Sequence, residues 1–174
     1  LYLVTHDTDP EHMASTAYPM AEFQRDLNRL EARNVIVLAD TCHSGGISDP
    51  AIGLRGPDDN SIVKSLRGIG LAGGDAKSDT PTPAQRLMFT SCEQDELSRE
   101  SADLGGGHGV FTWFLLQGLN GEADGRSYGD ADGQVKLGEL IEYTRDQVKR
   151  FTHNQQHPDT AGSFDRDLVM GAGR

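Results

Sequence analysis

The sequence predicts an α/β domain whose mostly parallel sheet is flanked by helices. Residues 35–39 form a continuous apolar, β-branched run of strand length, which is typical of a strand buried on both faces of a parallel sheet. Residues 86–91 form a second segment of this kind, and residues 20–30 carry apolar side chains at helical spacing. Because a chain of 174 residues can bury a sizeable core, we expect a single domain over residues 1–174.

The first part of the chain predicts a strand–helix–strand unit. Residues 1–5 have the composition of a strand, and the polar residues 6–10 form a turn after it. Met20, Phe23 and Leu27 mark the apolar face of an amphipathic helix that leads into the strand at residues 35–39. Parallel pairing of the two strands with a right-handed crossover follows. Since a domain rarely begins inside a core strand, we expect the chain to be truncated at its N-terminus.

A cysteine follows the apolar strand at the place where α/β proteins build their sites. Cys42 lies just past the strand, and Gly45 and Gly46 allow the backbone a close approach to a ligand. This is the geometry that a cysteine nucleophile needs. The alternative is a buried structural cysteine, which the polar neighbours of Cys42 disfavour.

The segment DTCHSG at residues 40–45 resembles the nucleophile motif of the caspase-like cysteine peptidases, in particular the metacaspase and bacterial caspase branch of the peptidase C14 type. The resemblance implies a caspase-like three-layer sandwich and covers nearly the whole chain. It makes residues 1–46 the end of the large portion with the nucleophile, residues 47–83 the loop between portions, and residues 84–174 the small portion.

Further motifs of the small portion support the resemblance. An acidic, polar segment follows the strand at residues 86–91, and it continues into a Ser-x-Glu at residues 98–100. The segment GHGVFT at residues 107–112 then opens an apolar helix over residues 110–119, which ends in Leu-x-x-Gly-Leu. Both features are typical of the family.

The segment at residues 47–83 is rich in Gly, Pro, Asp and Ser, with one short helix predicted over residues 61–69. Loops of this length in a compact domain are usually functional or disordered. The resemblance implies that self-cleavage occurs here, whereas a plain solvated loop is the alternative. Basic residues for such cleavage are present at Arg55, Lys64, Arg67 and Lys77.

An acidic segment near residue 130 partly matches an EF-hand calcium loop. Asp130, Asp132 and Glu139 fall at loop positions 3, 5 and 12, but position 1 is Tyr128, where a calcium loop requires a carboxylate. We therefore favour an acidic turn or short hairpin that feeds a last long helix over residues 137–151, and calcium binding stays an alternative. A polar connection over residues 154–167 and a short closing strand at residues 168–170 complete the chain.

A cysteine nucleophile requires a general base, because a thiol at its ordinary pKa is mostly protonated. In caspase-like peptidases the base is a His-Gly at the end of the strand that precedes the one opening this chain, and no residue here occupies that position. We expect an upstream segment to supply it, and we expect His108 to have a structural role at the start of its helix. The histidines of the chain are His6, His12, His43, His108, His153 and His157.

Asp40 is the predicted determinant of substrate choice. Two residues before Cys42 on a strand, its side chain points to the same face, so its carboxylate is expected to bind a basic P1 side chain, with Arg gaining a bidentate pair. The resemblance implies the same preference, since metacaspases cleave after Arg or Lys. Asp95 is a second candidate pocket carboxylate, and a solvated loop acid is its alternative.

The sequence therefore predicts a cysteine endopeptidase that cleaves after Arg or Lys, with Cys42 as nucleophile. No cofactor is required, and calcium activation stays open. A cysteine phosphatase is excluded, because Ser48 stands where its phosphate-binding Arg would be. A catalytically inactive caspase-fold scaffold is the main alternative, motivated by the missing base, and a calcium-binding module is the third.

Composition limits the partners and the compartment. The net charge of −11 disfavours nucleic acid and anionic membranes and fits basic peptides. No apolar run approaches the length of a membrane span. Two cysteines, Cys42 and Cys92, do not make a disulfide framework, so a cytoplasmic location is expected, although a bridge between them would silence the nucleophile.

Overall fold

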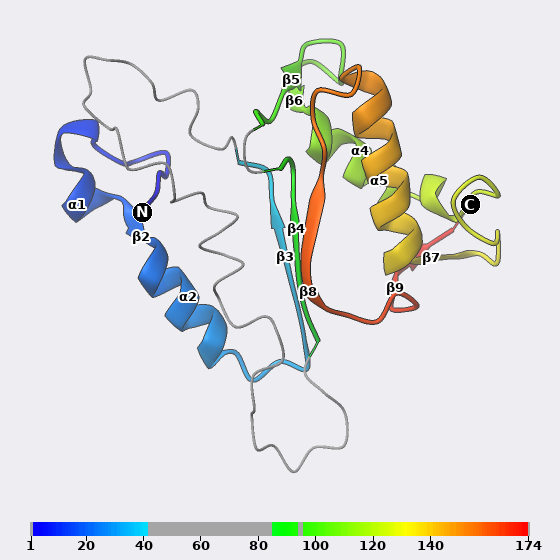
Figure 1. Cartoon of the computed structure of the whole chain (residues 1–174), viewed down its shortest axis with the longest axis horizontal. Helices are drawn as coiled ribbons and strands as arrows, with labels where there is room; N and C mark the ends of the chain where they lie inside the picture. The colour runs from blue at the N-terminus through cyan, green and yellow to red at the C-terminus, as the bar shows by residue number, and fades with distance from the viewer. Residues whose placement is uncertain (1, 42–84, 94–95, 174) are drawn as a thin grey trace.

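The computed structural model describes residues 2–41, 85–93 and 96–173 of the chain (Figure 1). Three of the predictions made above lie outside these residues. They are the position of Cys42, the position of Asp95, and the loop over residues 47–83 with its short helix.

The N-terminal part of the chain contains two short strands, three helical segments and the first long strand (Figure 1). The predicted helix over residues 20–30 is confirmed as α2, and the predicted strand over residues 35–39 is confirmed as β3. In order, the elements are β1 (Tyr2–Leu3), a 3-10 turn (Pro10–His12), α1 (Met13–Thr16), β2 (Tyr18–Pro19), α2 (Met20–Arg29) and β3 (Asn34–Ala39).

The C-terminal part contains the two helices expected from the sequence. Helix α4 spans Val110–Leu119 and α5 spans Leu137–Phe151, in agreement with the predicted bounds. The remaining elements are β4 (Gln85–Thr90), β5 (Glu100–Ser101), β6 (His108–Gly109), a 3-10 turn (Glu122–Asp124), β7 (Gln134–Lys136), β8 (Asp159–Ser163) and β9 (Val169–Ala172).

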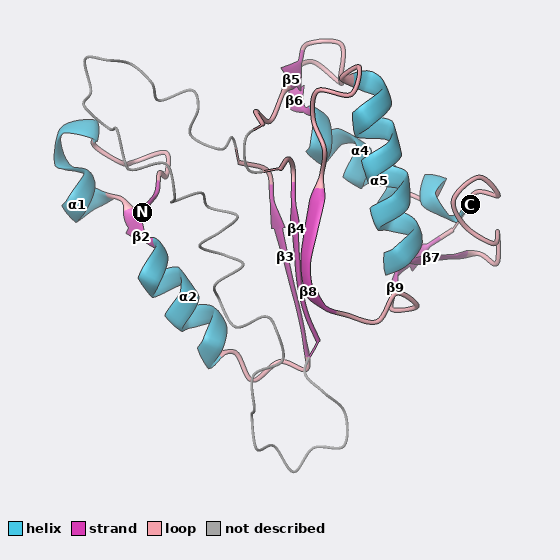
Figure 2. Cartoon of the chain, in the orientation of Figure 1, coloured by secondary structure: helices cyan, strands magenta, loops and turns pink. Residues whose placement is uncertain are grey.

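The main described sheet has the order β3-β4-β8 and is mixed (Figure 2). Strands β3 and β4 are parallel with Ile36 opposite Leu87, and β8 runs antiparallel to β4 with Gly162 opposite Leu87. Parallel pairing brings the carboxyl ends of β3 and β4 to the same edge of the sheet. The segments that follow Ala39 and Thr90 therefore leave the sheet side by side.

Helices cover both faces of this sheet, with α2 on one side and α4 and α5 on the other (Figure 1). Alternate residues of β4 face opposite layers: Met88 packs with Met20 of α2, whereas Leu87 and Phe89 join the larger core. In that core the rings of Phe89 and Phe111 make an edge-to-face contact with centroids 4.9 Å apart. The predicted three-layer α/β sandwich is confirmed.

The predicted strand–helix–strand unit at the start of the chain is wrong. Strand β1 pairs antiparallel with β2, with Leu3 opposite Tyr18, and is not part of the β3-β4-β8 sheet. The connection from β1 to β2 is shorter than the one from β1 to β3, so pairing with β2 costs less loop-closure entropy. Among the described strands β3 pairs with β4 alone, and Leu38 is 44 % exposed, so β3 is less buried than its apolar run suggested.

A strand that the sequence did not predict lies within the expected polar connection over residues 154–167. Strand β8 has the sequence DTAGS and carries no apolar alternation. Its backbone pairs with β4, whose apolar side chains supply the burial, so tertiary context overrides the weak strand propensity of β8. The predicted closing strand is confirmed as β9, which pairs with β7.

Candidate active site

Asp40 lies immediately after β3, at the edge of the sheet where parallel strands end. Its carboxylate accepts three hydrogen bonds from two distant segments. Oδ1 accepts from the Ser98 hydroxyl at 2.6 Å, and Oδ2 accepts from the Thr112 hydroxyl at 2.5 Å and from the Thr112 backbone N–H at 3.3 Å. The Asp40 side chain nevertheless stays exposed to solvent. The carboxylate is therefore held in one orientation and is still accessible.

The bond to the Thr112 backbone makes Asp40 a cap for helix α4. The N-cap residue of α4 is Gly109, which has no side chain to satisfy the first backbone N–H groups of the helix. Thr112 is the third residue of that helix, the position whose N–H an N-cap side chain normally bonds. The positive end of the helix dipole favours a carboxylate here. Asp40, which directly follows β3, thus caps α4 in place of a side chain at the N-cap position of the helix.

Gly109 is also required for space. A Cβ built on Gly109 would collide with Oδ2 of Asp40. The backbone of Gly109 has φ −57°, a value that other residues adopt readily, so the need for glycine here is steric rather than conformational. The second glycine of the GHG sequence is thereby explained by the position of the Asp40 carboxylate.

Gln156 holds the Ser98 segment in place from a fully buried position. Its Nε2 donates to the Ser91 carbonyl at 2.9 Å and to the Ser98 hydroxyl oxygen at 3.5 Å. Its Oε1 accepts from the Arg99 backbone N–H at 3.0 Å. One amide therefore ties the end of β4 to Ser98, and the donation from Gln156 leaves the Ser98 proton directed at Asp40.

A second set of contacts closes the same end of β4. The Glu96 carboxylate bonds the His157 ring at Nδ1 and accepts from the His157 backbone N–H at 2.6 Å. The Cys92 thiol donates to the Glu96 carbonyl at 3.5 Å, and Cys92 is only 2 % exposed. Cys92 is thus a core residue. A bridge between it and Cys42 lies outside the described residues.

The position of Cys42 itself is not described, but the residue before it is. The carbonyl of Thr41 accepts a hydrogen bond from the Ser91 hydroxyl at 3.4 Å. The backbone N–H of Ser91 in turn donates to the Ala39 carbonyl at 2.9 Å. These bonds continue the β3–β4 pairing past the strands, so the chain reaches Cys42 from the carboxyl edge of the sheet.

The described histidines near this edge have structural contacts. His108 lies in β6 next to Gly109, and its ring stacks on Trp113 with centroids 5.8 Å apart, in keeping with the structural role expected for it. The ring of His157 is held between Glu96 and Asn154, with Nε2 and Asn154 Oδ1 3.1 Å apart.

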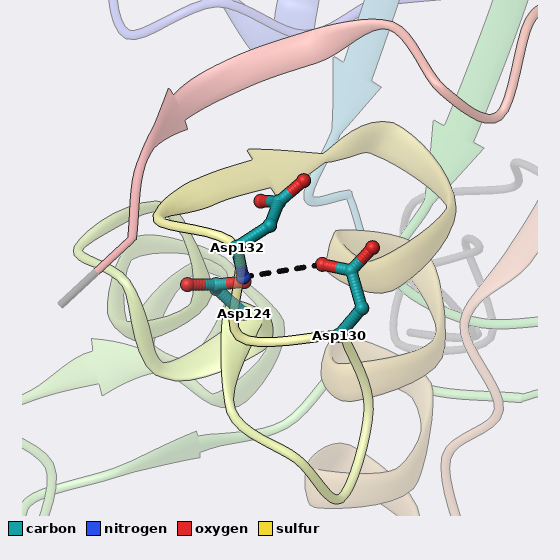
Figure 3. Close-up of side chains that lie close together, drawn as sticks. All are labelled: Asp124, Asp130 and Asp132. Carbon is teal, nitrogen blue, oxygen red and sulfur yellow. Dashed lines mark hydrogen bonds between the residues drawn. The ribbon is translucent and has the colours of Figure 1, made fainter.

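A separate acidic cluster gathers Asp124, Asp130 and Asp132, whose carboxylate oxygens lie within 4.8 Å of one another (Figure 3). Buried Asp124 accepts from the backbone N–H groups of Asp132 and Gly133, each at 3.1 Å. Asp130 Oδ1 also accepts from the Asp132 N–H at 3.2 Å, the bond drawn in Figure 3. The cluster lies at the turn before β7 and α5, so the predicted acidic turn feeding the last helix is confirmed.

A lysine supplies the positive charge beside this cluster. Nζ of Lys136 bonds Asp130 at 2.6 Å and Asp132 at 2.7 Å. These bonds raise the pKa of Lys136 and lower the pKa of Asp132. Glu139, the residue at calcium-loop position 12, accepts from the Lys136 N–H at 2.9 Å and so caps α5. The donor set is acidic, but an ammonium group satisfies it, and we assign no catalytic step to a metal here.

Comparison with known proteins establishes the family. A family model for the caspase domain matches residues 3–169, which is nearly the entire chain. The chain belongs to the caspase domain family. The caspase domain is of the cysteine peptidase type, a class of hydrolase whose substrates are proteins. No curated protein and no solved structure showed significant similarity. No helix among the described residues of the caspase domain is long and apolar enough to cross a membrane.

The residues that hold Asp40 were not recognised from the sequence. Ser98 and Thr112 belong to segments typical of the family, and no local pattern in the sequence connects them or Gln156 with Asp40. Ser98 lies 58 residues from Asp40 in the sequence and Thr112 lies 72 residues from it, so no local spacing connects either residue with Asp40. The available signal was the lack of a capping side chain at Gly109, which requires an acceptor from elsewhere.

Proposed function

We propose that this caspase domain is part of a cysteine endopeptidase of the metacaspase type, which cleaves proteins after Arg or Lys. Cys42 is the nucleophile, and the general base is a histidine from an upstream segment. The observation that carries the proposal is the Asp40 carboxylate, which is exposed at the carboxyl edge of the sheet two residues before Cys42 and is held in a fixed orientation. A fixed, accessible carboxylate is suited to bind a guanidinium or ammonium group.

The reaction is acyl transfer. The Cys42 thiolate attacks the carbonyl carbon of the P1 residue, and the electron pair of the carbonyl moves onto its oxygen, where backbone N–H groups stabilise the charge. When the intermediate collapses, the C–N bond breaks and the protonated histidine gives its proton to the leaving amine. Water, deprotonated by the same histidine, then attacks the thioester, and the acid product and the thiol are released.

The acidic character of the chain supports a basic substrate. The net charge of −11 favours the approach of cationic peptides to the chain. Asp95 is proposed as a second carboxylate near P1. Basic residues in the loop over residues 47–83 provide sites for self-cleavage between the large and small portions.

The decisive experiment uses the chain together with its upstream segment. Fluorogenic peptides that differ only in having Arg or Asp at P1 are assayed, with and without calcium, and Cys42→Ala is the control. Cleavage of the Arg peptide that is lost in Cys42→Ala supports the proposal. Cleavage of the Asp peptide alone contradicts the role of Asp40.

One structural observation is also consistent with a second candidate. Asp40 caps α4 and joins β3 to Ser98, so its carboxylate has a structural role that needs no substrate. A catalytically inactive caspase-fold scaffold accounts for this role equally well. Absence of cleavage of either peptide by the folded protein, with or without calcium, would favour the scaffold.

A further inference from the structure

We propose that Thr112 and Ser98 restrict Asp40 to a single contact with the P1 cation, so that the enzyme accepts Lys and Arg about equally. This inference rests on the proposed function and refines it. Ser98 and Thr112 are positioning residues, since they act on the substrate only through the Asp40 carboxylate.

The acceptor capacity of the Asp40 carboxylate limits how many hydrogen bonds a substrate can donate to it. An ionised carboxylate offers about four lone-pair positions, two on each oxygen. On Oδ2 both positions are occupied, by the hydroxyl and the backbone N–H of Thr112 at 2.5 and 3.3 Å. On Oδ1 the Ser98 hydroxyl at 2.6 Å occupies one position. With respect to the residues that the structure describes, one position, on Oδ1, therefore remains for a substrate.

The number of free acceptor positions on Asp40 matters because Arg and Lys side chains donate hydrogen bonds with different geometry. A guanidinium gains its advantage over an ammonium by donating two parallel hydrogen bonds, one to each oxygen of a carboxylate. Because Oδ2 is saturated, that bidentate pair cannot form at Asp40. Arg and Lys then each donate one charged N–H to Oδ1, and the bidentate Arg pair expected from the sequence is replaced by a single bond.

The carboxylate of Asp40 is not free to rotate and so to present both oxygens to a guanidinium. Both oxygens are bonded, and their partners are themselves fixed: Thr112 lies in the first turn of α4, and Ser98 is held by buried Gln156. A Cβ on Gly109 would collide with Oδ2, so the glycine leaves this space to the carboxylate. The orientation of Asp40 is thus set before substrate arrives.

Two variants of Thr112 separate the specificity effect from a loss of structure. Thr112→Val keeps the shape of the side chain and the backbone N–H but removes the hydroxyl, which opens one position on Oδ2. Thr112→Ser keeps the hydroxyl and is the matched control. We expect the ratio of kcat/KM for an Arg peptide to that for a matched Lys peptide to rise about tenfold in Thr112→Val, the gain of one further charged hydrogen bond. Thr112→Ser should keep the wild-type ratio.

Ser98→Ala provides a third comparison. It opens a position on Oδ1 but leaves Oδ2 saturated, so the bidentate pair stays blocked and the ratio of kcat/KM for the Arg and Lys peptides is expected to keep its wild-type value. A residue that served stability alone would change both rates together in every variant. The ratio of kcat/KM for the Arg peptide to that for the Lys peptide therefore separates the two cases, because a purely structural role does not change it.

The outcomes are distinct. In the wild-type protein we expect Arg and Lys peptides to be cleaved within about threefold of each other, and a preference for Arg above about tenfold would overturn the inference even if no variant folds. An unchanged ratio in a folded Thr112→Val protein would overturn it too, while the proposed function stands. Failure of the wild-type protein to cleave either peptide would overturn the proposed function and this inference together.

Discussion

The carboxylate of Asp40 occupies the space that a side chain on Gly109 would fill, and it caps the helix that Gly109 begins. Two residues far apart in the sequence are thereby made dependent on each other. The relationship joins the end of β3 to the start of α4. It also fixes the residue that we propose to recognise the substrate.

Substitution of Gly109 by Ala tests this relationship directly. The added Cβ meets Oδ2 of Asp40 and must displace it, so we expect a loss of about 1–3 kcal/mol in the free energy of unfolding, measured by urea denaturation. The control is Gly125→Ala at φ −61°, where the Cβ would lie 3.3 Å from the nearest carbonyl oxygen. Equal stability of the two variants would show that Asp40 moves aside without cost.

Gln156→Leu removes the amide that ties Ser98 to the end of β4. It leaves the Ser91 carbonyl and the Arg99 N–H without this partner, at a cost of about 1–3 kcal/mol for each group. The neighbouring Gln155 is exposed, so Gln155→Leu is the matched control and should change stability by no more than about 0.5 kcal/mol. Similar unfolding midpoints for the two proteins in guanidinium chloride would contradict the role assigned to Gln156.

Thr144 is expected to tolerate the loss of its hydroxyl. Among the described residues its fully buried Oγ1 has no hydrogen-bond partner, and burial of an unpaired hydroxyl is unfavourable. Thr144→Val should therefore raise the free energy of unfolding, by about 1 kcal/mol. Thr152→Val is the contrast, because the Thr152 hydroxyl donates to the Val148 carbonyl at 2.8 Å. Calorimetry should show a higher Tm for the first variant and a lower Tm for the second.

Lys136 should make stability sensitive to acid. Its bond to Asp132 lowers the pKa of that carboxyl from the ordinary value of 3.8. A lowered pKa contributes stability that is present above about pH 4 and is lost as the pH falls through the folded-state value. In Lys136→Met this contribution disappears, so the decline in stability below about pH 4 should be shallower than in the wild type.

Lys149→Met is the control for this measurement, since it removes one exposed lysine from α5. Unfolding by urea is followed from neutral pH down to about pH 2 for all three proteins. Identical acid dependence of the Lys136 and Lys149 variants would show that the contact between Lys136 and Asp132 does not matter in solution.

Much of the architecture was predictable from local patterns. The apolar runs of β3 and β4 and the helical spacing of α2, α4 and α5 identify these elements, because side-chain periodicity follows directly from backbone geometry. The DTCHSG segment indicated the family, and the family match over residues 3–169 agrees with it. Strand β8 and the pairing of β1 with β2 were not predictable, since both depend on which edges are available in space.

The sequence by itself determined the family, the α/β class and the choice of Asp40 as candidate substrate-binding residue. Each of these depends on a short contiguous stretch of residues. Only the tertiary structure decided what Asp40 contacts. Ser98, Thr112 and Gly109 lie more than fifty residues away and meet its carboxylate because parallel pairing brings β3 and β4 to one edge and α4 begins there. Hydrogen bonds of this kind depend on distance in space, so they cannot be predicted from the spacing of residues along the chain.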